Sequence, residues 1–271
     1  MKRFCQSAKQ ALSKTGIYLG LFSVVLSIIG IIGYEDLIGD YVYRFICAVG
    51  IFLLAYIVAL FKCYLCNSVS VQLGGNKIVV IGYGDFFSKQ GVIVIPFNRF
   101  FDTEVNEDIL SQRSMAGLFI KNAFPGNVLD LDRQISSSIK DIVPDTHHNI
   151  TKPGKRLAYP IGTVAKVQKG ANDYFCVALT DVDANNKSIC DIEMLHKTMI
   201  ELLGFIDREA NGQDVYMPVL GSGFSRLNKD KQVILEYLIS ILKTTNIPIQ
   251  SKLHIVLRET DRESINLTKH F

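Results

Sequence analysis

The chain has 271 residues, of which 48% are hydrophobic and 20% are charged, and its formal net charge is +3. Its mean hydropathy of +0.23 is unusual for a soluble protein and predicts that some part of the chain lies in lipid. Residues 1–66 hold six Lys/Arg and three Asp/Glu, whereas the rest of the chain holds 23 of each sign. This neutral C-terminal part argues against nucleic acid as the main partner, because nucleic-acid binding depends on neutralising phosphates.

Two apolar runs stand near the N-terminus. The first, residues 17–33, is uncharged and rich in Leu, Ile and Val; the second extends from 45 to 61 and continues past Lys62 to about 65. Each is close to the minimum length for a helix that crosses the hydrocarbon core. A signal peptide is the alternative for the first run, but no small-residue cleavage site follows it. We therefore expect residues 1–66 to form a transmembrane hairpin.

The charges beside these runs predict how the hairpin is oriented. Four Lys/Arg precede the first run, whereas the loop between the runs holds three acidic residues and only Arg44. The positive-inside rule then places both chain termini in the cytoplasm. Everything after about residue 67 is expected to be cytosolic.

The cysteines and histidines do not form a pattern typical of a metal site. The six cysteines are scattered, and we expect reduced thiols in a cytosolic setting. Cys63 and Cys66 have a metal-like spacing, but no second Cys/His pair matches it. His147 and His148 are adjacent in a Pro-containing loop, where histidines are usually solvated. The sequence therefore predicts no metal site.

From residue 76 onward, strand and helix patterns alternate. Strands are predicted at 77–81, 92–95, 162–167, 174–180, 215–219 and 253–257. Helical patterns are predicted around 109–110 and 118–120, and at 131–142, 192–206 and 233–242, with a loop at 144–156. Strands separated by helices over about 200 residues indicate an α/β fold with three layers, α/β/α, over residues 67–271.

Polar residues and glycines follow several of these strands. In α/β sheets ligands bind at the carboxyl ends of the strands. The predicted ends carry Gly84-Asp85, Asn98, Thr180-Asp181, Leu220–Gly223 and Arg258-Glu259. The Gly-Ser-Gly turn brings backbone N–H groups together as an anion site does, although a plain strand-to-helix turn is the alternative. With a carboxylate, an amide and the rings of Tyr83, Phe97 and Phe224 nearby, the set suits a nucleotide.

These motifs resemble those of the macro domain, an ADP-ribose-binding module with a mixed sheet. The resemblance rests on Gly84–Phe87, on Val92–Asn98 and on Pro218–Phe224. It implies that Asp85 accepts a hydrogen bond from the adenine amine, that Gly221–Phe224 wrap the diphosphate and that Asn98 lies near the distal ribose. The full set of ligand-binding residues expected is Asp85, Phe86, Asn98, Ser114, Gly117, Leu118, Leu220, Gly221, Ser222, Gly223, Phe224 and Arg258.

The chain departs from hydrolytic macro domains, which have an Asn-Ala-Ala-Asn segment followed by a triple-glycine loop. Here those segments read Pro96–Asp102 and Ser114–Leu118. Binding without turnover is therefore expected, with no catalytic residues and no cofactor. A membrane-anchored ADP-ribose hydrolase and a structural assembly module are the alternatives.

A hairpin followed by a divergent macro domain is similar to the membrane effectors of type II Thoeris anti-phage systems. That resemblance implies a multi-pass protein of the bacterial inner membrane. Its signal is expected to be an ADP-ribose derivative, a histidine conjugate, made by a partner TIR-domain enzyme. It also implies a homo-oligomer that damages the lipid bilayer once the signal is bound.

Overall fold

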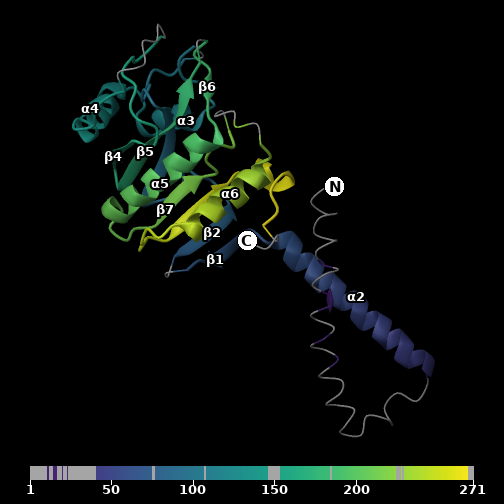
Figure 1. Cartoon of the computed structure of the whole chain (residues 1–271). Coiled ribbons are helices and arrows are strands. Elements are labelled where there is room, and N and C mark those ends of the chain that lie inside the picture. The colour runs from purple at the N-terminus through teal and green to yellow at the C-terminus, as the bar shows by residue number, and fades with distance from the viewer. Residues whose placement is uncertain are drawn as a thin grey trace. The chain divides into compact units, whose positions relative to one another are not determined.

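A computed structural model describes residues 41–74, 77–106, 108–145, 153–183, 185–223, 227 and 229–267, with a few isolated residues before 41. Helix α2 (Tyr41–Leu65) belongs to one compact unit, and residues 68–265 form another (Figure 1). The expected first membrane helix at 17–33 is almost wholly outside the described residues. His147, His148 and Phe224 lie outside them as well.

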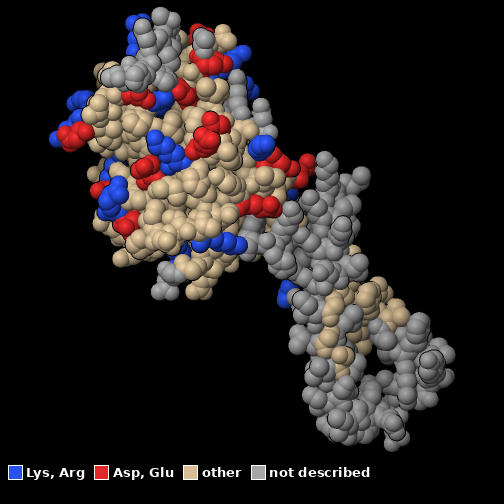
Figure 2. Space-filling view, viewed as in Figure 1, with Lys and Arg blue, Asp and Glu red and all other residues tan. Residues whose placement is uncertain are grey.

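Helix α2 confirms that the second apolar run is helical, and it begins at Tyr41, ahead of the run itself. Seven large apolar side chains on it are at least 40% exposed: Val49, Phe52, Leu53, Leu54, Ile57, Val58 and Phe61. Most of its described surface carries no charge (Figure 2). Over the part of the chain that the structure describes, no helix is long and apolar enough to cross a membrane. The hairpin stays a prediction.

The second unit is built on a mixed sheet with the strand order β1-β2-β8-β7-β3-β5-β4. The bounds are β1 Ser68–Gln72, β2 Ile78–Tyr83, β3 Val92–Asn98, β4 Val164–Lys169, β5 Asn172–Val182, β7 Val215–Pro218 and β8 Leu253–Leu257. Strands β2, β8, β7, β3 and β5 run parallel, whereas β1 and β4 are antiparallel to their neighbours at the two edges. A two-residue strand, β6 (Ser188–Ile189), pairs with the end of β5.

Helices cover both faces of this sheet, which confirms the three-layer α/β/α fold. On one face α3 (Met115–Ala123) and α4 (Val128–Ser138) share a core with alternate residues of β3 and β5, among them Ile95 and Cys176. On the other face lie α5 (Ile192–Glu209) and α6 (Lys231–Thr244) (Figure 1). There Phe175 of β5 meets Phe205 of α5 edge to face, with ring centroids 4.9 Å apart.

Most predicted elements are present, with local differences. Strand β8 has the predicted bounds, and β3 extends from the predicted 92–95 through Pro96 to Asn98. Helix α4 begins three residues before the predicted start. The helical character predicted at Ile109–Leu110 is wrong: these residues lie in turns closed by Asn106, whose side-chain oxygen accepts from the Ile109 N–H at 2.7 Å. Strands β1 and β6 and a short 3-10 helix, η2 (Glu259–Glu263), were not predicted.

Candidate functional site

The parallel pairing brings the predicted strand-end segments to one edge of the sheet. Because β2, β8, β7, β3 and β5 all run the same way, the segments that follow them emerge on the same side. The Gly84 N–H donates to the Leu257 carbonyl at 3.0 Å, so the turn after β2 lies beside Arg258. Pro218 is in register with Val256, so the segment after β7 lies on the other side of β8. This segment contains Leu220–Gly223 and is called the glycine loop below.

Asp85 stands exposed at the turn after β2. Its Oδ1 accepts the Phe87 N–H at 3.0 Å, and its carbonyl accepts the Ser88 hydroxyl at 3.0 Å. This short turn fixes the carboxylate at the edge and leaves it accessible to a ligand. Phe86, which was also predicted to bind ligand, is only 7% exposed and packs into the core behind the turn.

The glycine loop after β7 combines one constrained residue and one open residue. Gly221 has φ +84°, and a Cβ there would come within 3.4 Å of Leu227 and Leu195, so the residue needs to be glycine. Ser222 turns back on the strand, since its hydroxyl donates to the Val219 carbonyl at 2.7 Å. Leu220 is buried, whereas Gly223 is exposed and a Cβ there would meet nothing within 4 Å.

Asn98 holds the chain as it leaves β3. Its Nδ2 donates to Asp102 Oδ2 at 2.9 Å, and its Oδ1 accepts the N–H groups of Phe100 and Asp102. Asp102 is fully buried, and its Oδ1 accepts the Lys155 N–H at 2.8 Å. This network stabilises the tight turn in which Phe101 has φ +51°. Asn98 therefore shapes the end of β3, and the distal-ribose contact predicted for it stays a prediction.

The strand ends diverge between β7 and β3. Their ladder stops at the pair Ile93–Tyr216, although β3 continues to Asn98 against β5 alone. Ligands of parallel sheets bind where neighbouring strand ends separate in this way. Sequence patterns give no signal for this separation, because it depends on how far two distant strands stay paired.

Ser114 and Gly117 have structural roles at the start of α3. The Ser114 hydroxyl caps the helix by accepting the Gly117 N–H at 3.0 Å. Gly117 is buried, and a Cβ on it would come 2.3 Å from the Ser111 carbonyl oxygen. Leu118 is half-buried in the same turn. The ligand contacts predicted for these three residues stay predictions.

Arg258 follows β8 and is 61% exposed along its side chain. Its backbone N–H and its guanidinium both donate to Asp261, which also accepts the Lys231 ammonium at 2.6 Å. Burial alone would raise the pKa of Asp261, but the hydrogen bonds from Lys231 and Arg258 outweigh burial and lower this pKa below its usual value. The cluster joins η2 to the start of α6, beside the glycine loop.

Two of the three rings expected for stacking have other contacts. Phe97 is 2% exposed and packs between Phe101 and Phe119, so it is not available to a ligand. Tyr83 donates its hydroxyl to the Ile265 carbonyl, and the Arg262 guanidinium lies 4.1 Å above its ring. Both rings therefore support the fold around the edge.

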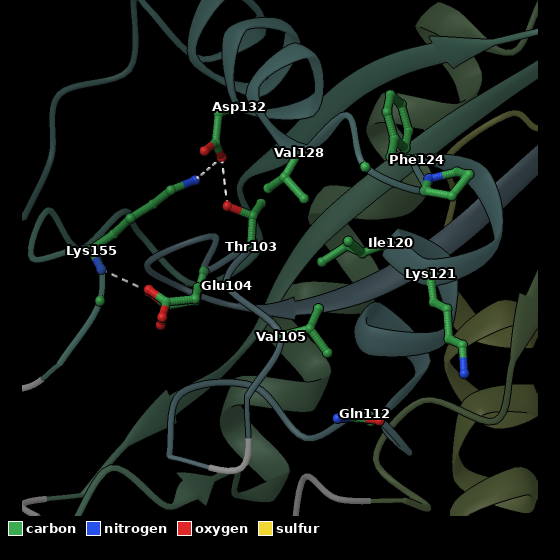
Figure 3. A pocket seen from close by; sticks show the side chains of 14 residues that line it. Thr103, Glu104, Val105, Gln112, Ile120, Lys121, Phe124, Val128, Asp132 and Lys155 are labelled. Carbon is green, nitrogen blue, oxygen red and sulfur yellow. Dashed lines mark hydrogen bonds and ion pairs between the residues drawn. The ribbon is translucent and has the colours of Figure 1, made fainter.

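A hollow of about 870 Å³ opens beside the turn that ends β3 (Figure 3). Its apolar wall includes Val105, Ile120, Phe124 and Val128. Opposite them, Lys155 and Thr103 point at Asp132, with distances of 2.5 Å and 2.6 Å to the same oxygen. These residues were not predicted; the polar run Asp102–Glu104 directly after a buried strand was the available signal. Asp102 lines the hollow and bonds Asn98, so the two sites share a wall.

No group of three or more His, Cys, Asp and Glu side chains suited to a metal ion occurs among the residues that the structure describes. Cys176 and Cys190 are free thiols. Burial raises the pKa of Cys190 to about 12, and it raises the pKa of Cys176 further. Both thiols are therefore poor nucleophiles.

Comparison with known proteins identifies the family. The family model described as "Thoeris protein ThsA, Macro domain" matches residues 79–258. The chain belongs to the Thoeris ThsA macro-domain family. A Thoeris protein ThsA from Bacillus amyloliquefaciens (strain Y2) is 28% identical over 232 aligned positions, and the alignment covers 82% of this chain and 75% of the relative.

Among solved structures, the chain is similar to the Oceanobacillus iheyensis macrodomain with ADP. The TM-score is 0.46 at 14% identity, over 73% of this chain and 90% of that one. The Trypanosoma brucei macrodomain in complex with ADP-ribose gives a TM-score of 0.42 at 10% identity, over 69% of this chain and 66% of that one. The matched range of the ThsA macro family begins in β2 and ends at Arg258, so it includes every strand end at the candidate site.

Proposed function

We propose that this chain is a membrane effector of Thoeris anti-phage defence. Its macro domain senses an ADP-ribose-derived signal, and the N-terminal part then disrupts the bacterial inner membrane. The observation that carries the proposal is the adjacency of Asp85, the glycine loop and Arg258 on the carboxyl edge of three neighbouring parallel strands. Membership of the ThsA macro family supports the same reading.

The ligand pose follows from the order of the strands. Asp85, exposed at the outer end of the edge, accepts the adenine amine, with Arg258 beside it. The diphosphate lies against Gly221–Gly223, where the backbone can approach an anion closely. The distal ribose then points towards the end of β3, and the group attached to it enters the neighbouring hollow. This hollow has an apolar wall and a charged wall, so it suits a group that has both an apolar part and a polar or charged part.

The residues nearest the distal ribose of the ligand favour sensing over hydrolysis. Asn98 uses its side-chain amide to hold the turn, and the two oxygens of Asp102 accept from Asn98 and from the Lys155 backbone. A fully buried carboxylate held by these two donors is poorly placed to reach and activate a water molecule beside the ligand. Binding without turnover is the consequence.

The proposed disruption of the membrane depends on the N-terminal segment. The exposed apolar side chains of α2 match a helix that is covered by lipid or by other helices. We expect α2 to form the second arm of the transmembrane hairpin, with the macro domain in the cytoplasm. The signal comes from a TIR-domain enzyme, and copies of the chain assemble in the membrane when it binds.

Binding of ADP-ribose and of its histidine conjugate to the full-length chain in detergent tests the pocket. We expect Asp85→Ala and Gly223→Glu each to weaken binding at least tenfold, a change of about 1.4 kcal/mol. The first removes the adenine partner, and the second places a negative charge beside the diphosphate. Asp141→Ala, at an exposed aspartate after α4, and Gly223→Ala, for which there is open space, are the matched controls.

Three outcomes would count against the proposal. Unchanged affinity in both pocket variants would place the ligand elsewhere. Absence of any binding by the wild-type chain would leave only a structural assembly role. Release of free ADP-ribose from the conjugate, lost in Asn98→Ala or Asp102→Asn, would establish the hydrolase instead.

A further inference from the structure

The two edges of the sheet differ in how they are closed to pairing with a further strand. At the β4 edge, the backbone N–H groups of Lys166 and Gln168 donate to Ser138 and Gln134 of α4, at 2.7 Å and 2.9 Å. Lys166 also forms ion pairs with Asp173 and Glu209. Helix side chains and lysines thus close this edge against further strand pairing, as edge strands usually require.

Among the residues that the structure describes, no helix side chain or lysine closes the β1 edge in this way. Its sequence, Ser-Val-Ser-Val-Gln, contains no charge and no proline, and every residue is at least partly exposed. On one side β1 pairs with β2. On its other side, over Val69–Gln72, no hydrogen-bond partner is found among the residues that the structure describes. An uncharged open edge of this kind is a template for another strand.

The composition of β1 makes it complementary to itself. When two copies pair antiparallel about Ser70, Ser70 faces its own equivalent, Val69 faces Val71 and Ser68 faces Gln72. A strand carrying a charge at its centre would place like charges opposite each other, which destabilises a pair. Here every pair is polar with polar or valine with valine. A two-fold contact uses one patch on both partners, as most homodimers do.

We propose that β1 is the surface through which two copies of this chain associate, joining their sheets into one continuous sheet across a two-fold axis. This contact is present before the signal binds, and it provides the pair of chains from which the signal-triggered assembly of the proposed function starts. It rests on the self-association in the proposed function and does not require bound nucleotide. The β1 edge also follows α2 after only two residues, so the contact is close in sequence to the proposed membrane segment.

Cross-linking of Ser70→Cys in the full-length chain, in membranes and without nucleotide, tests the contact. Cys5, Cys47, Cys63 and Cys66 are replaced by Ser, whereas the buried Cys176 and Cys190 are kept. A short bis-maleimide linker is expected to give at least fivefold more covalent dimer than it gives with the control Leu129→Cys, at a residue 78% exposed on α4. Equal yields from the two variants would overturn the proposal.

A charge-exchange test separates pairing from simple proximity. Differently tagged copies carrying Ser70→Lys or Ser70→Glu are co-expressed, and co-purification is measured. Like-charged combinations are expected to co-purify several-fold less than wild type, and the Lys–Glu combination is expected to recover. Wild-type levels in the like-charged combinations, or failure of the Lys–Glu combination to recover, would contradict antiparallel pairing about Ser70. We expect cross-linking to persist in Gly223→Glu, because loss of nucleotide binding should leave the β1 contact intact.

Discussion

At the scale of single residues, several positions that look like ligand contacts in the sequence are already used by the fold. Asn98 uses its amide to hold the turn after β3, and Gly117 is glycine because the Ser111 carbonyl occupies the space of a side chain. Asp85 and Gly223 differ from them, since both are exposed at the sheet edge. These two are therefore the positions at which a ligand effect can be separated from a folding effect.

The packing at Gly117 predicts opposite effects for the same substitution in two helices. Gly117→Ala forces a Cβ into the Ser111 carbonyl, and we expect it to destabilise the domain by about 1–3 kcal/mol. Gly204→Ala in α5 meets only the flexible end of Arg208, so better helix propensity should stabilise by up to about 1 kcal/mol. Denaturant unfolding of the full-length variants measures both. A neutral Gly117→Ala would mean that the α3 turn is looser than described.

The buried carboxylate of Asp261 predicts a pH-dependent loss of stability. Its pKa is lowered in the folded chain, so its contribution is fully present above the unfolded pKa of about 4 and is lost as pH falls through the folded value. Asp261→Asn is expected to cost about 2 kcal/mol at pH 7 and progressively less below pH 4. Unfolding midpoints of both proteins across this range provide the measurement. If the stability difference between wild type and Asp261→Asn does not change with pH, packing and not charge explains the effect.

At the scale of elements, the site depends on segments that the sequence predicts unequally. A short apolar run locates β8, and the three-and-four spacing from Ile192 locates α5, because a strand buried on both faces is apolar throughout and a helix buried on one face is apolar at regular intervals. The Ser-Val-Ser-Val-Gln sequence of β1 does alternate, but it is only five residues long and directly follows a long apolar helix, so it was not recognised as a separate strand. Only the polar run Asp102–Glu104 marks the hollow in the sequence, because the rest of it is assembled from α3, α4 and the loop at Gly154-Lys155.

The position of this hollow predicts a variant that discriminates between ligands. Val105→Trp fills part of its apolar wall, away from Asp85 and the glycine loop. We expect affinity for the conjugated ADP-ribose to fall about tenfold, a loss of about 1.4 kcal/mol, while affinity for unmodified ADP-ribose changes by less than about twofold. Parallel titrations with the two ligands measure this ratio. Equal losses for both would mean that the attached group lies outside the hollow.

At the scale of the whole molecule, the chain couples an α/β domain to an apolar segment whose action it is proposed to control. A ligand can drive assembly only if it binds the assembled state more tightly than the resting state. In the proposed mechanism the macro domain supplies that binding energy. Its charges of both signs are interspersed over the face in view (Figure 2). On this face no large area of a single charge is seen that would attract another copy by general electrostatics.

This coupling predicts a phenotype in cells that also express the TIR-domain partner. Asp85→Ala and Gly223→Glu should abolish signal-triggered growth arrest while leaving the amount of protein in the membrane fraction unchanged. Growth after infection and fractionation of the same cultures measure the two properties. Growth arrest that survives both substitutions would show that the pocket is not the trigger.

The connection between α2 and β1 is only Cys66 and Asn67, which reach about 10 Å at full extension. In an antiparallel β1 pair centred on Ser70, the two Ser68 residues stand about 14 Å apart, at about 3.4 Å per residue. Helices in direct contact lie about 8–10 Å apart. In such a pair the sheets would set the distance between the starts of the two linkers, and the short linkers would limit how far apart the two α2 helices can lie.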